Sequence, residues 1–448
     1  MAEGDKPNFR KAWVVTVDMG YGHERASHGI EDIAYGDPIV ANNYPGIPAR
    51  DRKLWNQSRM LYETVSRFKS VPLIGEAVWE LFDRFQEIKP FYPRRDLTKP
   101  NIQLHQLYWL IEKMGLGRHL TDKLRARKLP LVCTYFLPAF AAEYFDYPED
   151  IYLVTTDADV SRAWVARDPK RSRIKYFASN GRVVERLKLY GVPSERIYLT
   201  GFPLSKDLIG GAGYGTIKKD LGERICHLDP AGIFYDKYHD TLKRTLGVEN
   251  CARTPSHALT LTFAVGGAGA QRELGIKIAE SLREKIRRGK IILNLVAGTR
   301  RQTASYFKRH LEDVGLGSDL GEGVRILWYP DRPSYFKKFD QLMRKTDILW
   351  TKPSELSFYT GVGLPIIAAP PIGSQEKFNL IWLQNVGGGM PQFDPAYADE
   401  WLFDWVNSGG LARMAWNGFI EAPTHGAYRI EEIITGLPVK LPKLPLIV

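Results

Sequence analysis

An amide and a carboxylate stand side by side in the segment 370–379, directly after a short apolar run. The segment reads Pro-Pro-Ile-Gly-Ser-Gln-Glu-Lys-Phe-Asn and follows Gly-Leu-Pro-Ile-Ile at 363–367, a pattern typical of a turn into a buried strand. In open α/β sheets, small molecules bind just beyond the carboxyl ends of strands. A carboxylate can accept hydrogen bonds from two vicinal ribose hydroxyls, and amides both donate and accept. Gln375, Glu376 and Asn379 are therefore candidate nucleotide-sugar ligands; the alternative is a surface loop with incidental polar residues.

A second candidate is the glycine-rich run Val-Gly-Gly-Ala-Gly-Ala-Gln at 265–271, which lies between a predicted strand and a predicted helix. Glycine lets the backbone approach a ligand closely, and the N–H groups and dipole of a helix N-terminus favour a phosphate. Any tight turn between a strand and a helix can use glycine, so the loop alone is a weak signal. It has no G-K-[ST] lysine, which argues against an ATPase. The candidate positions are Gly266, Gly267, Ala268, Gly269 and Gln271.

A third candidate is His23, which ends the glycine turn Gly-Tyr-Gly-His at 20–23. The turn follows the apolar run 12–17, so the imidazole is expected at the carboxyl end of a first strand, before a helix that starts at Arg25. A histidine can take a proton from an attacking hydroxyl near neutral pH. The simpler alternative is a histidine that caps or packs.

A fourth feature is an aromatic, basic and amphipathic stretch at about 50–100. Apolar side chains recur there at helical spacing, and arginine and lysine are interleaved with aromatic residues that include Trp79 and Phe82. Such a stretch suits an enzyme that rests on an anionic bilayer. The alternative is that these helices pack on the core of the first domain, as amphipathic helices usually do.

These candidates are carried by a chain in which apolar strands alternate with helices, which indicates parallel βαβ units. The predicted strands are 12–17, 131–134, 151–156, 174–179 and 197–203, and then 257–265, 290–296, 324–328, 347–351 and 363–367. The pattern restarts near 257, so we predict two α/β domains, 8–205 and 257–425. Residues 206–256 are predicted as a linker or insertion, with a flexible glycine-rich run at 210–215, and 426–448 as a C-terminal tail whose prolines after Leu437 exclude a helix there.

Length and composition set the limits of these assignments. The chain has 448 residues, 44% of them hydrophobic and 25% charged, and a formal net charge of +11, which suggests an anionic partner. Its three cysteines form no C-x-x-C pair, so they indicate neither a disulfide framework nor a zinc site and favour a reducing cytosol. The sequence has no signal-peptide pattern and no run of 18 apolar residues, so membrane contact is expected to be peripheral.

Taken together, these motifs resemble glycosyltransferase family 28, the two-domain GT-B enzymes, and most of all its diacylglycerol galactosyl- and glucosyltransferases. The family's opening G-G-G-H-R-A-S turn is matched by 20–27, with Tyr21 in place of a glycine and Glu24 inserted. Its T-D turn is matched by Thr156 and Asp157, and its G-[LFI]-P segment by 201–203. Its G-L-P-[IV]-I and Q-E-x-x-N motifs are matched by 363–367 and 375–379, and this last pair is the most specific.

The resemblance implies a role for each matched position. His23 is the expected general base on the acceptor hydroxyl, with Gly22, Asp157, Trp79 and Phe82 on the acceptor side. The donor side is expected to comprise the glycine turn from Gly266 to Gln271, which would hold the pyrophosphate, and Gln375, Glu376 and Asn379, which would hold the sugar or ribose. The family has a ribose-binding glutamate before Gly-Leu-Pro; Glu355 is the candidate, at a shorter interval.

The sequence therefore predicts an α/β protein of the GT-B type, with two Rossmann-like domains whose parallel sheets face a cleft. The predicted activity is inverting transfer of a hexose from a UDP-sugar to a lipid hydroxyl, without cofactor or metal, at the cytosolic face of the membrane. A nucleic-acid partner is not expected, because no stacking-sheet motif of an RNA-binding fold is present. Two alternatives stay open: a UDP-sugar 2-epimerase of the same fold, and an inactive GT-B scaffold that binds anionic membrane.

Overall fold

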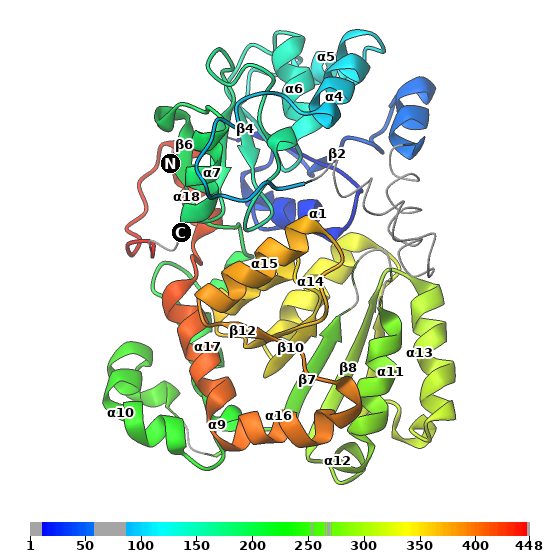
Figure 1. Ribbon diagram of the computed structural model, residues 1–448, viewed down its shortest axis with the longest axis vertical. Helices are drawn as coiled ribbons and strands as arrows, with labels where there is room; N and C mark the ends of the chain where they lie inside the picture. The colour runs from blue at the N-terminus through cyan, green and yellow to red at the C-terminus, as the bar shows by residue number, and fades with distance from the viewer. Residues whose placement is uncertain are drawn as a thin grey trace, which may run out of the picture. The chain divides into compact units, whose positions relative to one another are not determined.

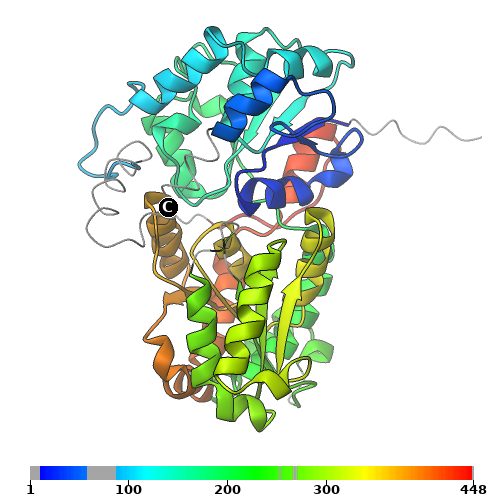
Figure 2. The same ribbon diagram turned by 90° about the vertical axis from the view of Figure 1, so that its right-hand side faces the viewer.

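The computed structural model describes residues 11–57, 87–251, 254–264, 266, 269 and 271–445, and its chain divides into two compact units (Figures 1 and 2). The first unit comprises the chain up to Ser205 together with the C-terminal segment His425–Leu446, and the second comprises Lys206–Thr424. Each unit is built on one six-stranded sheet in which all strand pairs are parallel.

The sheet of the first unit has the strand order β2-β1-β3-β4-β5-β6. Its described elements, with 3-10 helices marked η, are β1 (Trp13–Thr16), α1 (Tyr21–His28), η1 (Glu31–Ile33), β2 (Ile39–Val40), α4 (Ile102–Glu112), α5 (Arg118–Leu124), β3 (Leu131–Cys133), α6 (Phe136–Tyr144), β4 (Ile151–Val154), η2 (Arg162–Trp164), β5 (Lys175–Ala178), α7 (Gly181–Leu189), η3 (Ser194–Arg196), β6 (Ile197–Leu199) and α18 (Gly426–Thr435).

The sheet of the second unit has the order β12-β11-β10-β7-β8-β9. Its described elements are α8 (Lys206–Ile209), α9 (Gly215–Leu228), α10 (Ile233–Leu246), η4 (Val248–Asn250), β7 (Leu259–Ala264), α11 (Arg272–Ser281), α12 (Arg283–Arg287), β8 (Ile291–Gly298), α13 (Arg301–Asp313), η5 (Gly317–Asp319), β9 (Val324–Trp328), α14 (Arg332–Met343), β10 (Ile348–Thr351), η6 (Glu355–Val362), β11 (Ile366–Ala368), α15 (Ser374–Asn385), β12 (Gly389–Pro391), η7 (Pro395–Tyr397), α16 (Ala398–Asn407) and α17 (Gly410–Glu421).

The central strands are buried along their whole length, as expected for parallel strands covered on both faces. Every residue of β3, β4, β7 and β10 is buried. One face of the first sheet packs on α4 and α6 through Leu104, Tyr108 and Phe140, among others. The other face packs on α18 through Ile430 and Ile434. In the second unit, α11 and α13 lie side by side next to β7 and β8 (Figure 1).

The segment predicted as a linker, 206–256, is instead helical from α8 to η4 and belongs to the second unit. Ile217, Leu221 and Ile225 recur at the helical spacing in α9 and are buried. The glycine-rich run at 210–215 led to the prediction of a flexible linker, because glycine runs favour loops, and the amphipathic pattern that follows it was not assigned to a helix. The buried guanidinium of Arg224 also donates to the carbonyl oxygens of Thr346, Val362, Gly363 and Met343 at 2.9–3.2 Å.

The structure differs from the sequence-based prediction in three further places: the C-terminal segment, the start of the first helix and two short edge strands. Residues 426–435 of the predicted tail form α18, although the proline-rich segment after it contains no helix over its described residues. The first helix starts at Tyr21 rather than at Arg25, because Gly20 already adopts the extended positive-φ conformation that precedes the helix (φ 107°, ψ 175°). The short edge strands β2 and β12 were not predicted, since two or three residues carry too little periodicity.

The predicted fold class is confirmed: each unit is a Rossmann-like α/β domain with a parallel sheet. The ten predicted strands all occur, as β1, β3 to β6 and β7 to β11. The cleft between the sheets stays a prediction. Within the described residues, no helix combines the length and the apolar character needed to cross a bilayer.

Candidate active site

His23 lies in the first turn of α1, at the carboxyl edge of the first sheet. Its half-buried ring is followed by buried residues 24–27, so the helix packs inward while the imidazole stays accessible. The residues nearest to Nδ1 follow neighbouring strands: Thr134 comes directly after β3, and Thr156 comes two residues after β4. The strand order therefore brings two other segments of the chain to this histidine.

The hydrogen bond at Nδ1 fixes which ring nitrogen can act as a base. His23 Nδ1 lies 2.7 Å from the carbonyl oxygen of Thr134 and 3.4 Å from the Thr156 hydroxyl oxygen. A carbonyl oxygen only accepts, so Nδ1 carries the proton in this contact and Nε2 carries the lone pair. The carbonyl that orients the ring is itself fixed, because Thr134 N–H donates to Val15 and its hydroxyl donates to Thr16.

Aromatic rings lie beside this histidine, and the described acceptor-side candidates, Gly22 and Asp157, adjoin His23 and Thr156 in sequence. The ring centroids of Tyr135 and buried Trp164 are 4.9 and 6.0 Å from that of His23. Gly22 precedes His23 in α1 and is half-buried, as is Asp157, which follows Thr156. The Ser179 hydroxyl donates to the Asp157 carbonyl oxygen at 2.7 Å, which fixes the turn after β4.

The predicted donor-side residues gather at the carboxyl edge of the second sheet. Gly266 follows β7, Lys352 follows β10, and the segment after Ala368 follows β11; these three strands are neighbours. A Cβ atom on Gly266 would lie only 2.5 Å from Cε of Lys352. A side chain at 266 would require the Lys352 side chain to shift, a constraint that concerns a neighbouring side chain rather than a ligand.

Glu376 links two of these loops through both of its carboxylate oxygens. Oε1 lies 2.5 Å from Nζ of Lys352, and Oε2 accepts from the Ile372 N–H at 2.7 Å. The side chains of Lys352 and Glu376 are 24% and 13% exposed, so solvent weakens this ion pair only in part. Each carboxylate oxygen has a second lone pair, so Glu376 can still accept a hydroxyl while it holds the lysine.

The remaining described donor candidates border the same edge. Gln271 has a left-handed backbone (φ 64°) before α11, and its Nε2 donates to the Pro370 carbonyl oxygen at 2.9 Å. Buried Asn379 donates from Nδ2 to the carbonyl oxygen of Pro353 at 3.3 Å. The first bond ties the β11–α15 loop to the segment after β7, and the second ties α15 to the loop after β10.

Three further candidates are placed by their elements. Gly269 (φ 71°) donates its N–H to the Gly266 carbonyl oxygen at 2.8 Å. Gln375 is half-buried in the first turn of α15, and Glu355 is the half-buried first residue of η6, three residues after Lys352. Gly267 and Ala268 on the donor side, and Trp79 and Phe82 on the acceptor side, lie outside the described residues.

Sequence reasoning missed two residues that contact the candidates at these edges, Thr134 and Lys352. Both directly follow a buried strand, and Lys352 stands before a proline in the segment Thr-Lys-Pro-Ser-Glu. A polar residue at the end of an apolar run was therefore an available signal. The apolar runs do not indicate which strands are neighbours in the sheet. They therefore do not indicate which of these residues contact one another.

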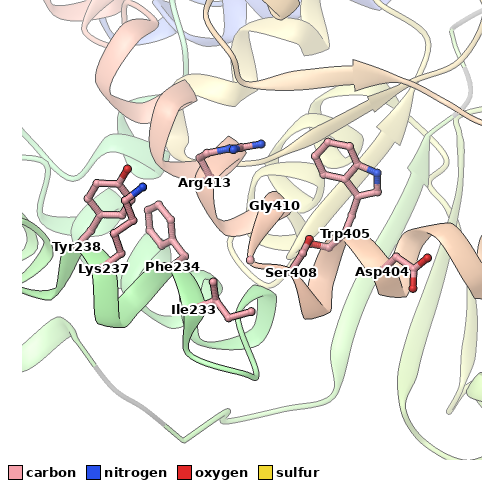
Figure 3. Close-up of a pocket in the computed structure, with 10 residues that line it drawn as sticks. Ile233, Phe234, Lys237, Tyr238, Asp404, Trp405, Ser408, Gly410 and Arg413 are labelled. Atoms are coloured by element: carbon pink, nitrogen blue, oxygen red, sulfur yellow. The ribbon is translucent and has the colours of Figure 1, made fainter.

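A separate pocket of about 500 Å³ lies between α10 and the junction of α16 and α17 (Figure 3). Phe234, Lys237 and Tyr238 line it from α10, and Trp405 and Arg413 line it from the facing helices. None of the predicted site residues lines this pocket.

The two Rossmann-like units with polar strand-end loops define the class as a two-domain α/β protein of the GT-B type. No family model matches the chain. In sequence it is 21% identical over 395 residues, 85% of this chain and 81% of the relative, to a processive diacylglycerol beta-glucosyltransferase of Bacillus cytotoxicus. A protein of the same name from Bacillus subtilis is 24% identical over 239 residues, 53% of this chain and 49% of that relative.

Solved structures resemble the chain at lower sequence identity. A UDP co-structure of MnaA from S. aureus has a TM-score of 0.44 at 13% identity, covering 97% of this chain and 99% of that one. MurG from Acinetobacter baumannii has a TM-score of 0.42 at 10% identity, covering 75% and 77%.

Proposed function

We propose that this chain is a glycosyltransferase that moves a hexose from a UDP-sugar to a hydroxyl group of a lipid at the cytosolic face of a membrane. The observation that carries the proposal is the hydrogen bond from His23 Nδ1 to the Thr134 carbonyl oxygen, which leaves Nε2 with the lone pair a general base needs. The sequence similarity to diacylglycerol beta-glucosyltransferases supports the choice of a lipid acceptor.

In the proposed reaction, His23 Nε2 takes the proton of the acceptor hydroxyl as its oxygen attacks the anomeric carbon. The bond from that carbon to the diphosphate oxygen breaks, and UDP leaves with the bonding electron pair. The configuration at the anomeric carbon inverts, because this is a single displacement. The imidazolium then returns its proton to water.

The departing diphosphate needs positive charge at the edge of the second sheet. Lys352 supplies a full charge there, and the N-terminus of α15 supplies backbone N–H groups and a favourable dipole. The Gly266–Gln271 turn would contribute further backbone N–H groups. We propose that these groups take the place of a metal ion as the electrostatic stabilisers. Gln375, Asn379 and Glu355 are proposed contacts of the sugar or ribose, with Glu376 accepting a hydroxyl while it orients Lys352.

The test is transfer from radiolabelled UDP-glucose, UDP-galactose and UDP-N-acetylglucosamine to vesicles that contain diacylglycerol, with products separated by chromatography. One donor is expected to label the lipid. His23→Ala is expected to lower the rate about 10²–10⁴-fold, the usual contribution of a general base. The dissociation constant for UDP should stay unchanged, because His23 is proposed to touch only the acceptor.

The matched control is His105→Ala, which removes an exposed histidine of α4 in the same unit and should retain full transfer. Transfer that survives His23→Ala would contradict the assignment of the base. Conversion of the UDP-sugar without any lipid present would favour the 2-epimerase. Absence of any nucleotide binding would favour the inactive scaffold.

A further inference from the structure

Two histidines and a glutamate meet in the second unit, away from the proposed donor edge. Glu223 and His227 lie on α9, and His257 lies two residues before β7. Each offers one ligand atom, and these atoms all lie within 4.8 Å of one another. Two imidazoles and one carboxylate are a ligand set that zinc sites use.

His227 shows the clearest sign of a missing partner. Its side chain is 1% exposed, and its Nδ1 lies 2.8 Å from Oδ1 of Asp347. The carboxylate accepts, so Nδ1 carries the proton and Nε2 carries the lone pair. Nε2 is buried and has no hydrogen-bond partner. Leaving a buried polar atom unpaired is unfavourable, so a ligand on Nε2 would stabilise the folded unit.

His257 is oriented in the same way as His227. Its Nδ1 lies 2.8 Å from the Ala258 carbonyl oxygen and 3.9 Å from Oδ2 of Asp347. Asp347 therefore faces both imidazoles, and its Oδ2 also accepts from the Thr260 N–H at 2.8 Å. Metal-binding histidines usually donate their other ring N–H to a carboxylate or a carbonyl, which fixes the tautomer and the ring. Both histidines have that partner.

Glu223 completes the set from the same face of α9. It precedes His227 by four residues, a spacing that places both side chains on one face of a helix. Its carboxylate accepts from the hydroxyl of Ser256, the residue just before His257. The helix and the chain entering β7 thus meet at this glutamate.

We propose that Glu223, His227 and His257 bind one Zn²⁺ ion, with Asp347 orienting His227. Three protein ligands leave a fourth position for water. The ion would link α9 to the residues just before β7. It would thereby stabilise the packing of the helical segment 206–250 against the sheet of its own unit. His257 lies before the amino end of β7, whereas Gly266 follows its carboxyl end. Six residues of strand span roughly 20 Å, so this ion is distinct from the proposed transfer chemistry.

The spacing of the cysteines could not indicate this zinc site, because no cysteine belongs to it. Its ligands are histidines and a glutamate from two elements, and the helix that carries two of them was predicted as a linker.

The experiment uses the full chain without a histidine tag, stripped with a chelator and then incubated with Zn²⁺ or Co²⁺. Metal content by mass spectrometry is expected to reach one equivalent, and Co²⁺ is expected to give the visible absorption of a tetrahedral site. His257→Gln and Glu223→Gln should each weaken Zn²⁺ binding at least about 100-fold, beyond the loss seen when only a ligand's orienting partner is removed. These two positions are only partly buried, so both variants are expected to fold.

The matched control is His239→Gln, which removes an exposed histidine of α10 that pairs with Asp240. It should bind zinc as the unchanged protein does. Equal affinity in His257→Gln, Glu223→Gln and the unchanged protein would overturn the proposal. So would a wild-type protein that retains no metal after incubation and gives no Co²⁺ spectrum, a readout that does not depend on any variant.

Discussion

Lys352 lies at the proposed donor edge, beside the glycine turn after β7 and the first turn of α15. Its stem passes beside Gly266, and its ammonium group pairs with Glu376. The carboxylate keeps the lysine aimed at this edge and balances its charge. A diphosphate that binds here would share the lysine with Glu376, so the ion pair would affect the affinity as well as the geometry of the proposed site.

We expect Lys352→Ala to weaken UDP binding about 10- to 100-fold. A hydrogen bond to a charged group contributes about 1.5–3 kcal/mol, and 1.4 kcal/mol corresponds to a factor of ten. The measurement is the dissociation constant by calorimetry. Lys345→Ala is the control, because Lys345 is exposed just before the same strand. An unchanged constant for Lys352→Ala would show that the diphosphate binds elsewhere.

At the scale of elements, the turn between β1 and α1 determines where His23 lies. Gly20 has φ 107° and ψ 175°, a backbone region that residues other than glycine rarely adopt. A Cβ at this position would meet no atom within 4 Å, so the requirement for glycine comes from the backbone and not from space.

Gly20→Ala is therefore expected to cost about 1–3 kcal/mol of stability, the usual cost of a strained backbone residue. If the turn relaxes instead, α1 shifts and transfer falls with it. Thermal unfolding and the transfer rate are measured together. Gly213→Ala is the control, since that glycine has open space and no positive φ. Equal stability and equal activity for both variants would contradict the assigned role of the turn.

The last helix, α18, contributes to the core of the first unit. Ile430 is fully buried in a cluster with Val14, Val132 and Val154 from three strands. Ile430→Ala should destabilise the first unit by about 2–5 kcal/mol, the range for such core truncations. Denaturant unfolding measures this, with Ile420→Ala as control because that side chain is 45% exposed. A midpoint for Ile430→Ala equal to that of the control would argue against a structural role for the helix.

At the scale of the whole molecule, the net charge of +11 bears on the proposed membrane contact. Each lysine or arginine near an anionic bilayer adds about 1 kcal/mol of attraction, and salt screens it over about 10 Å at 0.1 M. We expect the protein to sediment with vesicles rich in anionic lipid at low salt, and to be released as the salt is raised. Equal sedimentation with neutral vesicles would contradict this expectation.

The aromatic contribution to that contact is tested separately. Replacing Trp79 and Phe82 by alanine should lower vesicle binding that survives high salt, because apolar insertion is not screened by ions. If the variant retains this binding, the alternative is favoured, in which the stretch 50–100 packs on the core of the first domain.

The sequence by itself determined the class of fold and singled out the segments that are predicted to carry chemistry. Parallel strands that are buried on both faces appear in the sequence as continuous apolar runs, and ligand-binding loops follow the carboxyl ends of such strands. The strands and the loops can therefore both be recognised in the amino-acid sequence. Glu376, Gln271 and His23 were found in this way. Their roles in binding and catalysis stay predictions.

Only the tertiary structure decided which of these residues meet. Strand order brings Thr134 to His23 and Lys352 to Glu376, and neither pair is encoded in local periodicity. The same reason explains the assignment of α9 and α18 to their units and the meeting of His227 with His257. Local propensity fixes elements, but contacts between distant elements depend on packing that only the folded chain specifies.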